Sequence, residues 1–133
     1  VGCLFENSRT HGVVTLGGDM HLIDSVVRGT MPRELDGLGG DGVIFGAWES
    51  PAGGSVVGCT VENSARVGIA SFGATVRVEN VQLACNTIDL NGEILNGAEF
   101  EFLDGGGTHC GCQSDDWDCA VLSSSIEPPQ AIE

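Results

Sequence analysis

The sequence predicts an all-β chain in which short strands are stacked in successive turns, and three observations lead to this prediction. Two distant stretches, GCLFENS at 2–8 and GCTVENS at 58–64, are nearly identical. Apolar and polar residues alternate with a period of two in runs such as TVRVENVQL, which is typical of strands. The 21 glycines are spread along the chain and separate these runs. Strands this short cannot bury a hydrophobic face alone, but stacked turns can.

The spacing between copies of a recurring four-residue signature gives the length of the repeat. This signature is found at 1–4, 23–26, 57–60 and 78–81, so that successive copies are separated by 22, 34 and 21 residues. The long interval contains the segment TMPRELDGLGGD, which is rich in turn-forming and charged residues. Removal of this segment restores a period close to 22. We therefore predict stacked turns over 1–104 that are interrupted by an insertion loop at 30–41.

The unit of about 22 residues, with the signature V-x-N/S/C-x and a later Gly-Ile or Gly-Val, resembles the repeat of the pectin-lyase-like superfamily. This resemblance implies an all-β fold, a right-handed parallel β-helix of about four to five coils. An antiparallel sandwich is the alternative, because its short strands and glycine turns look the same locally. A sandwich predicts no register between copies, whereas the two similar stretches align over about sixteen residues.

The six cysteines fall into two groups when they are placed on the predicted coils. Cys3 and Cys59 occupy equivalent positions two coils apart, which puts their Cα atoms roughly 9.6 Å from each other. A disulfide needs less than about 7 Å, so both are expected to be buried thiols. Two disulfides are expected to fix a cysteine-rich C-terminal cap and tail at 105–133, and they involve Cys85, Cys110, Cys112 and Cys119. The alternative is a zinc-like site formed by His109 with the cysteines beside it.

Charge, hydropathy and cysteine count restrict the partners and the cellular compartment that we expect for the protein. The net charge is −14, and all five basic residues are arginines that lie before residue 78. Such a surface repels nucleic acid and anionic membranes. No run of 18 apolar residues is present, so we expect no membrane insertion. The even cysteine count favours an oxidising compartment, and we expect a secreted or cell-surface protein that is the C-terminal part of a larger one.

Two loops carry candidate functional side chains, and both leave the same predicted coil, so we expect them to flank one groove. Paired carboxylates can act as acid and base on a glycosidic bond. The candidates for catalysis are Asp36, Asp41 and Glu49. An exposed tryptophan ring stacks well on sugars. The candidates for binding are Arg33, Glu34 and Trp48. The alternative is that the insertion is a solvated loop whose acidic residues only keep the chain soluble.

No cofactor is expected, and calcium is a second metal for which the sequence offers candidate ligands. Carboxylates within short loops are the oxygen ligands that calcium prefers. The insertion loop contains two of them, and a second cluster consists of Asp115, Asp116 and Asp118. Neither cluster has the spacing of a twelve-residue calcium loop.

The resemblance implies carbohydrate chemistry on one long face of the helix, near the middle of many more coils than this chain contains. The motif sets of pectin hydrolases and pectate lyases are not present in convincing form. We therefore expect a non-catalytic extracellular module that recognises a glycan or a partner protein, and not an enzyme by itself. Two alternatives stay open: a fragment of a polysaccharide lyase or hydrolase, and a structural module that self-associates end to end.

Overall fold

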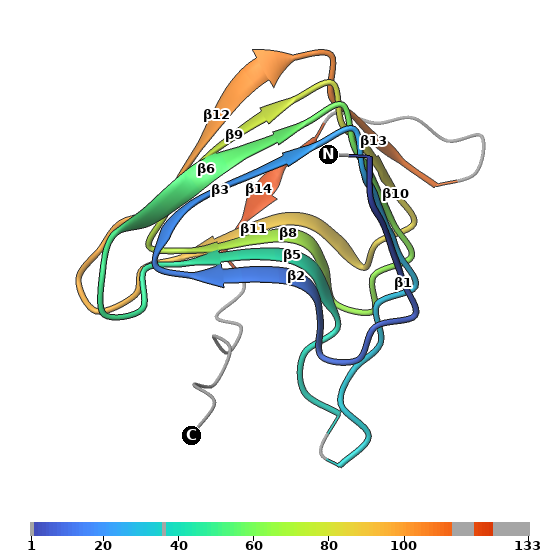
Figure 1. Cartoon of the computed structure of the whole chain (residues 1–133), viewed down its shortest axis with the longest axis horizontal. Helices are drawn as coiled ribbons and strands as arrows, with labels where there is room; N and C mark the ends of the chain where they lie inside the picture. Colours follow the sequence, from blue (N-terminus) through green and yellow to red (C-terminus); the bar gives the residue numbers. More distant parts are fainter. Residues whose placement is uncertain (1, 36, 113–118, 124–133) are drawn as a thin grey trace.

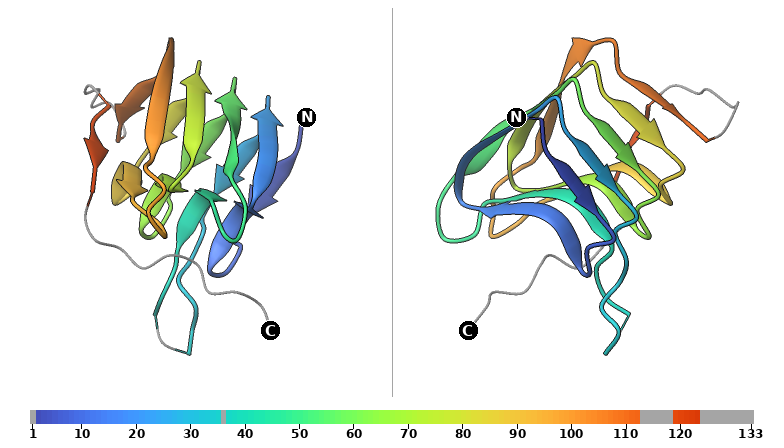
Figure 2. Two further views of the ribbon diagram at one scale, coloured as in Figure 1. Left: turned by 90° about the vertical axis from the view of Figure 1, so that its left-hand side faces the viewer. Right: turned by 45° about the vertical axis from the view of Figure 1, so that its right-hand side comes forward.

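The computed structural model describes residues 2–35, 37–112 and 119–123, and in it the chain winds as a right-handed parallel β-helix. Figure 1 shows the coils as triangles, and Figure 2 shows them following one another from the N-terminal end. Each side of the triangle is a sheet, and a coil contributes at most one strand to it. All pairings between the named strands are parallel, so the predicted one-way stacking is confirmed.

Three sheets contain the strands of the described residues. Sheet 1 consists of β1 (Leu4–Glu6), β4 (Val26–Arg28), β7 (Thr60–Glu62), β10 (Gln82–Ala84) and β13 (His109–Gly111). Sheet 2 consists of β2 (His11–Leu16), β5 (Asp41–Gly46), β8 (Val67–Phe72), β11 (Ile88–Glu93) and β14 (Val121–Leu122). Sheet 3 consists of β3 (Gly18–Ile23), β6 (Ala52–Val57), β9 (Thr75–Glu79) and β12 (Glu101–Gly106).

Two columns of residues with left-handed backbone form the corners on either side of sheet 1. The column before the sheet consists of Gly2, Asp24, Gly58, Asn80 and Gly107, and the column after it of Asn7, Gly29, Asn63 and Cys85. Glycine and asparagine adopt positive φ more readily than other residues. The backbone N–H groups of eight of these nine residues donate to the next coil, for example from Asn7 to the Arg28 oxygen at 3.0 Å. The Gly and Asn shared by the two similar stretches therefore mark equivalent corners two coils apart.

The register of the fourth copy differs from the predicted one by a single residue. We aligned Val57 with Val78, but the structure pairs Val57 with Glu79 and Val56 with Val78. The predicted equivalence of Val57 and Val78 is therefore wrong by one residue. The difference matters because a one-residue shift moves every side chain to the other face of the sheet. The observed register keeps Val56 and Val78 in the core, at 0% and 4% exposure.

The core lies inside the triangle and is built mainly from aliphatic side chains of all three sheets. Gly12, Gly42 and Gly68 stand at the second position of successive strands of sheet 2. A Cβ atom at any of them would come within 2.5–2.8 Å of a carbonyl oxygen on the next coil. Only glycine allows the coils to approach this closely, and this explains the later Gly of the repeat unit.

The insertion loop leaves after β4 and returns at β5, and it projects from the corner between sheets 1 and 2 (Figure 1). Its predicted end is wrong by one residue, since Asp41 belongs to β5 and pairs with His11 of β2. Stacking also continues after residue 104, because β13 pairs with β10 and β14 pairs with β11.

The four predicted cysteines form two disulfides near the C-terminal end. Cys85 bonds to Cys112 and Cys110 bonds to Cys119, with Cα–Cα distances of 4.5 and 5.2 Å. Cys85 and Cys112 follow the paired residues Ala84 and Gly111, so this bond joins adjacent coils. The cysteine-rich, disulfide-stapled end is therefore confirmed, and the zinc alternative loses its thiolate ligands.

Cys3 and Cys59 remain thiols, as expected for positions two coils apart. Cys59 is 2% exposed, and its sulfur donates to the carbonyl oxygens of Leu22 and Val57 at 3.3 Å. Cys3 is exposed, so its predicted burial is wrong. It lies on the first described coil, where only one neighbouring coil packs against it. In the described ranges the chain has no helix of the length and apolarity needed to cross a membrane.

Candidate functional site: a pocket between three coil corners

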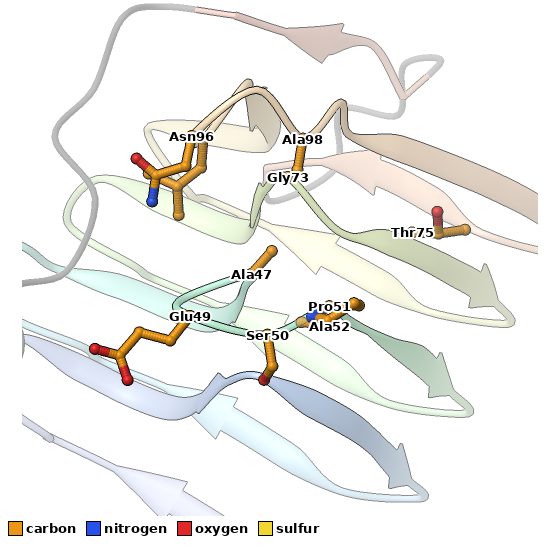
Figure 3. Close-up of a pocket in the computed structure, with 10 residues that line it drawn as sticks. Ala47, Glu49, Ser50, Pro51, Ala52, Gly73, Thr75, Asn96 and Ala98 are labelled. Atoms are coloured by element: carbon orange, nitrogen blue, oxygen red, sulfur yellow. The ribbon is translucent and has the colours of Figure 1, made fainter.

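A pocket of about 480 Å³ lies where the chain passes from sheet 2 to sheet 3 (Figure 3). Three consecutive corners line it. The middle corner between β8 and β9 contains only Gly73 and Ala74, whereas the corners between β5 and β6 and between β11 and β12 are longer. The short corner forms the floor and the two longer loops form the walls. The lining residues are Ala47, Glu49, Ser50, Pro51, Ala52, Gly73, Thr75, Leu95, Asn96 and Ala98.

One wall is a tight turn with Asn96 and Gly97 at its tip. Leu95 and Ala98 exchange two backbone hydrogen bonds of 3.0 and 2.9 Å. Asn96 and Gly97 have φ values of 50° and 80°, which two-residue turns of this type require. Any Cβ at Gly73 would lie 2.9 Å from the Ala98 side chain, so the turn packs directly against the floor.

The opposite wall presents Glu49, an exposed residue whose φ is 69°. A non-glycine residue in this region costs roughly 1–3 kcal/mol and persists only where the surroundings impose it. Figure 3 shows the Glu49 and Asn96 side chains directed to the same side of the pocket from the two walls. The corner is held to the floor by the Ala47 N–H, which donates to the Phe72 oxygen at 2.9 Å.

The pocket combines a few polar groups with a small apolar surface. Glu49 supplies acceptors, Ser50 and Thr75 supply hydroxyls, and Asn96 supplies an amide that both donates and accepts. Such a set suits a ligand with many hydroxyl groups.

The predicted binding and catalytic residues are distributed over two separate corners. Glu49 lines the pocket, and Trp48 is half-buried on the same loop. Arg33 and Glu34 lie on the insertion loop, at the other end of the six-residue strand β5, which is about 17 Å long. The expectation that the two loops flank one groove is therefore wrong. Asp36 lies outside the described residues.

Asp41 forms a buried clamp between coils and has 0% exposure. Its Oδ1 accepts hydrogen bonds from Arg66 Nε at 2.8 Å and from the Val67 N–H at 3.2 Å, and its Oδ2 pairs with Arg66 Nη2. Burial lowers the pKa of the facing His11, the Asp41 charge partly offsets this, and Arg66 adds to the lowering. This position leaves no carboxylate surface on Asp41 for a substrate.

The candidate calcium ligands Asp115, Asp116 and Asp118 lie outside the described residues. In the part of the chain that the structure describes, no three His, Cys, Asp or Glu side chains come together in a group that could hold a metal ion.

The sequence reasoning missed the turn around Asn96 and the contribution of Thr75. The dipeptide Asn96-Gly97 between apolar residues is a strong signal for a tight two-residue turn. No signal of this kind marks Thr75, because its place in the pocket depends on the short corner beside it.

No family model, curated protein or solved structure matches the chain, so its own geometry defines the class to which it belongs. That class is the parallel β-helix repeat protein.

Proposed function

We propose that this chain is an extracellular β-helix module that recognises a glycan through the pocket between its coil corners. The observation that carries the proposal is the convergence of Glu49, Ser50, Thr75 and Asn96 from three consecutive corners on one pocket. All of these groups can exchange hydrogen bonds with sugar hydroxyls.

The size and rigidity of the pocket support a small ligand. Its volume of about 480 Å³ lies within the range of small-molecule sites, roughly 300–1,000 Å³, and fits one or two sugar rings. Each wall continues directly into paired strands, so little ordering is required when the ligand binds.

Charge favours a neutral glycan over an acidic one. The chain carries a net charge of −14, and Glu49 adds a carboxylate at the pocket itself. An anionic sugar would be repelled by both.

Two further features support an extracellular, carbohydrate-directed role. The two disulfides suit an oxidising compartment such as the cell exterior. The repeat resembles that of the pectin-lyase-like superfamily, whose members act on polysaccharides, and we propose that the chain is a member.

Binding of neutral oligosaccharides tests the proposal, first on a glycan array and then by calorimetry. We expect Asn96→Ala, Glu49→Gln and Thr75→Ala each to weaken binding about fivefold or more, since one hydrogen bond contributes about 1 kcal/mol. Thr60→Ala is the matched control, because Thr60 is also the first residue of its strand but lies in sheet 1.

Two results would contradict the proposal. One is a folded wild-type protein that binds no neutral glycan on a broad array. The other is binding that survives both Asn96→Ala and Thr75→Ala.

A further inference from the structure

We infer that the corner pocket selects amino sugars, which are glycans whose rings carry an ammonium group in place of a hydroxyl. This inference rests on the proposed function, because it concerns the same pocket. Among the described residues that line the pocket, Glu49 is the one charged side chain. Two further exposed carboxylates, those of Asp19 and Glu101, lie on sheet 3 next to the pocket.

Strand register places these two carboxylates in one row with a residue of the pocket. Thr75, which lines the pocket, pairs with Gly53 on one neighbouring strand and with Glu101 on the other. Gly53 in turn pairs with Asp19 of β3. Neighbours in such a row are about 4.8 Å apart, so both carboxylates lie within two strand spacings of Thr75.

The carboxylates of this row point away from the core. Side chains alternate between the two faces along a strand. The next residue along each of the strands β3, β9 and β12 belongs to the core or packs against it, namely Met20, Val76 and Phe102. Asp19 Oδ1 lies 3.7 Å from the position that a Cβ on Gly53 would occupy. The Asp19 carboxylate therefore reaches over β6, the strand that separates β3 from Thr75.

All three carboxylates are available to a cation. Each ion pair found in the described part of the chain joins an arginine to some other acidic residue, and Asp19, Glu49 and Glu101 take part in none of them. Glu49 is also held in place by its loop, since its φ of 69° persists only where the surroundings impose it.

The arginine on the same face of β9 does not neutralise the row. Arg77 stands two residues after Thr75 and contacts Glu79 at an N–O distance of 3.6 Å. Its Nη2 lies 3.1 Å from the position that a Cβ on Gly105 would occupy. The guanidinium is therefore directed to the far end of β12, away from the pocket.

This arrangement suits a chain of sugar rings with one positive charge on each ring. The hydroxyl and amide groups of the pocket can exchange hydrogen bonds with the ring hydroxyls. The carboxylates are spread out, and in the described ranges no three acidic, His or Cys side chains converge on a point where a metal ion could sit. Separate ammonium groups can meet these carboxylates one at a time. The net charge of −14 adds a long-range attraction for such a ligand.

Calorimetry on the full chain tests the inference with a glucosamine tetrasaccharide and its N-acetylated counterpart. At about pH 6 an amine of this kind is protonated, whereas acetylation removes the charge and keeps the ring hydroxyls. We expect the glucosamine tetrasaccharide to bind at least about tenfold more tightly, since one exposed charge pair contributes up to about fivefold and three carboxylates are present. Added salt should reduce this preference, because it screens exposed charges.

Substitutions of the row separate local charge from the charge of the whole chain. Asp19→Asn and Glu101→Gln should each lower the preference about twofold to fivefold. Glu62→Gln is the matched control and should keep the preference. It removes the same charge from β7 in sheet 1, the side of the triangle opposite the corner that holds the pocket.

Several results would overturn the inference. Equal binding of the two tetrasaccharides would do so and would leave the proposed function standing. Tetralysine that binds as tightly as the glucosamine tetrasaccharide would show that any cation is attracted. A preference that falls equally in Glu62→Gln and Glu101→Gln would show the same. If neither tetrasaccharide binds, the inference fails, and the array of neutral glycans decides the proposed function separately.

Discussion

Replacement of Asp41 by asparagine tests whether this residue is a structural clamp. The substitution keeps the shape of the side chain but removes its charge, so that an amide NH₂ faces the donors of Arg66. Loss of one partner of a buried ion pair costs about 3–5 kcal/mol, and one charge-assisted hydrogen bond contributes about 1.5–3 kcal/mol. The Arg66 side chain keeps 21% exposure, so water can partly replace the lost anion. We therefore expect a loss of about 2–4 kcal/mol.

Urea denaturation at pH 7 measures this loss through the transition midpoint and slope. Glu6→Gln is the matched control, because Arg28 contacts Glu6 Oε2 through Nε at 2.9 Å and Nη2 at 2.8 Å, but both side chains are 44–45% exposed. An exposed pair of this kind contributes about 0–1 kcal/mol. Equal losses in the two variants would refute the reasoning that burial makes the Asp41 pair important.

Three further predictions concern the cysteines and His11. A thiol reagent should modify Cys3 in the folded protein and Cys59 only after denaturation, because burial covers Cys59 and raises its pKa; six reactive thiols without reductant would contradict the disulfides. Loss of the bond between Cys85 and Cys112, which are 27 residues apart, should lower the free energy of unfolding by about 3–4 kcal/mol, and an unchanged melting temperature would argue against this. The pKa of His11 is lowered from 6.5, so the unfolded chain binds its proton more readily and stability should fall as pH drops below that value. His11→Gln should flatten this dependence in denaturation curves taken across that range, and identical slopes would show that His11 is not responsible.

The coil was predictable because the corners impose a local requirement that can be read from single residues. Gly2 and Gly58, like Asn7 and Asn63, recur where the backbone turns left-handed. The register of the fourth copy was not predictable in this way. Val57 and Val78 match as residue types, but the number of residues in each coil decides which face a side chain occupies.

The candidate site was predicted only in part. Glu49 lies in a pocket, but its partners come from the next two corners and not from the insertion loop. Asp41 resembles a loop carboxylate in the sequence because glycines surround it. In the structure Asp41 is instead the first residue of β5, pairs with His11 of β2 within sheet 2, and forms an ion pair with Arg66.

The sequence by itself determined that the chain winds into parallel coils and that four of its cysteines close one end, because both depend on local backbone preference and on a regular spacing. The tertiary structure alone decided which corners enclose a pocket and that Ser55 meets His21 across a separation of 34 residues. These contacts arise between coils, where loop length and side-chain rotamer set the distance, and neither is encoded in a repeat period.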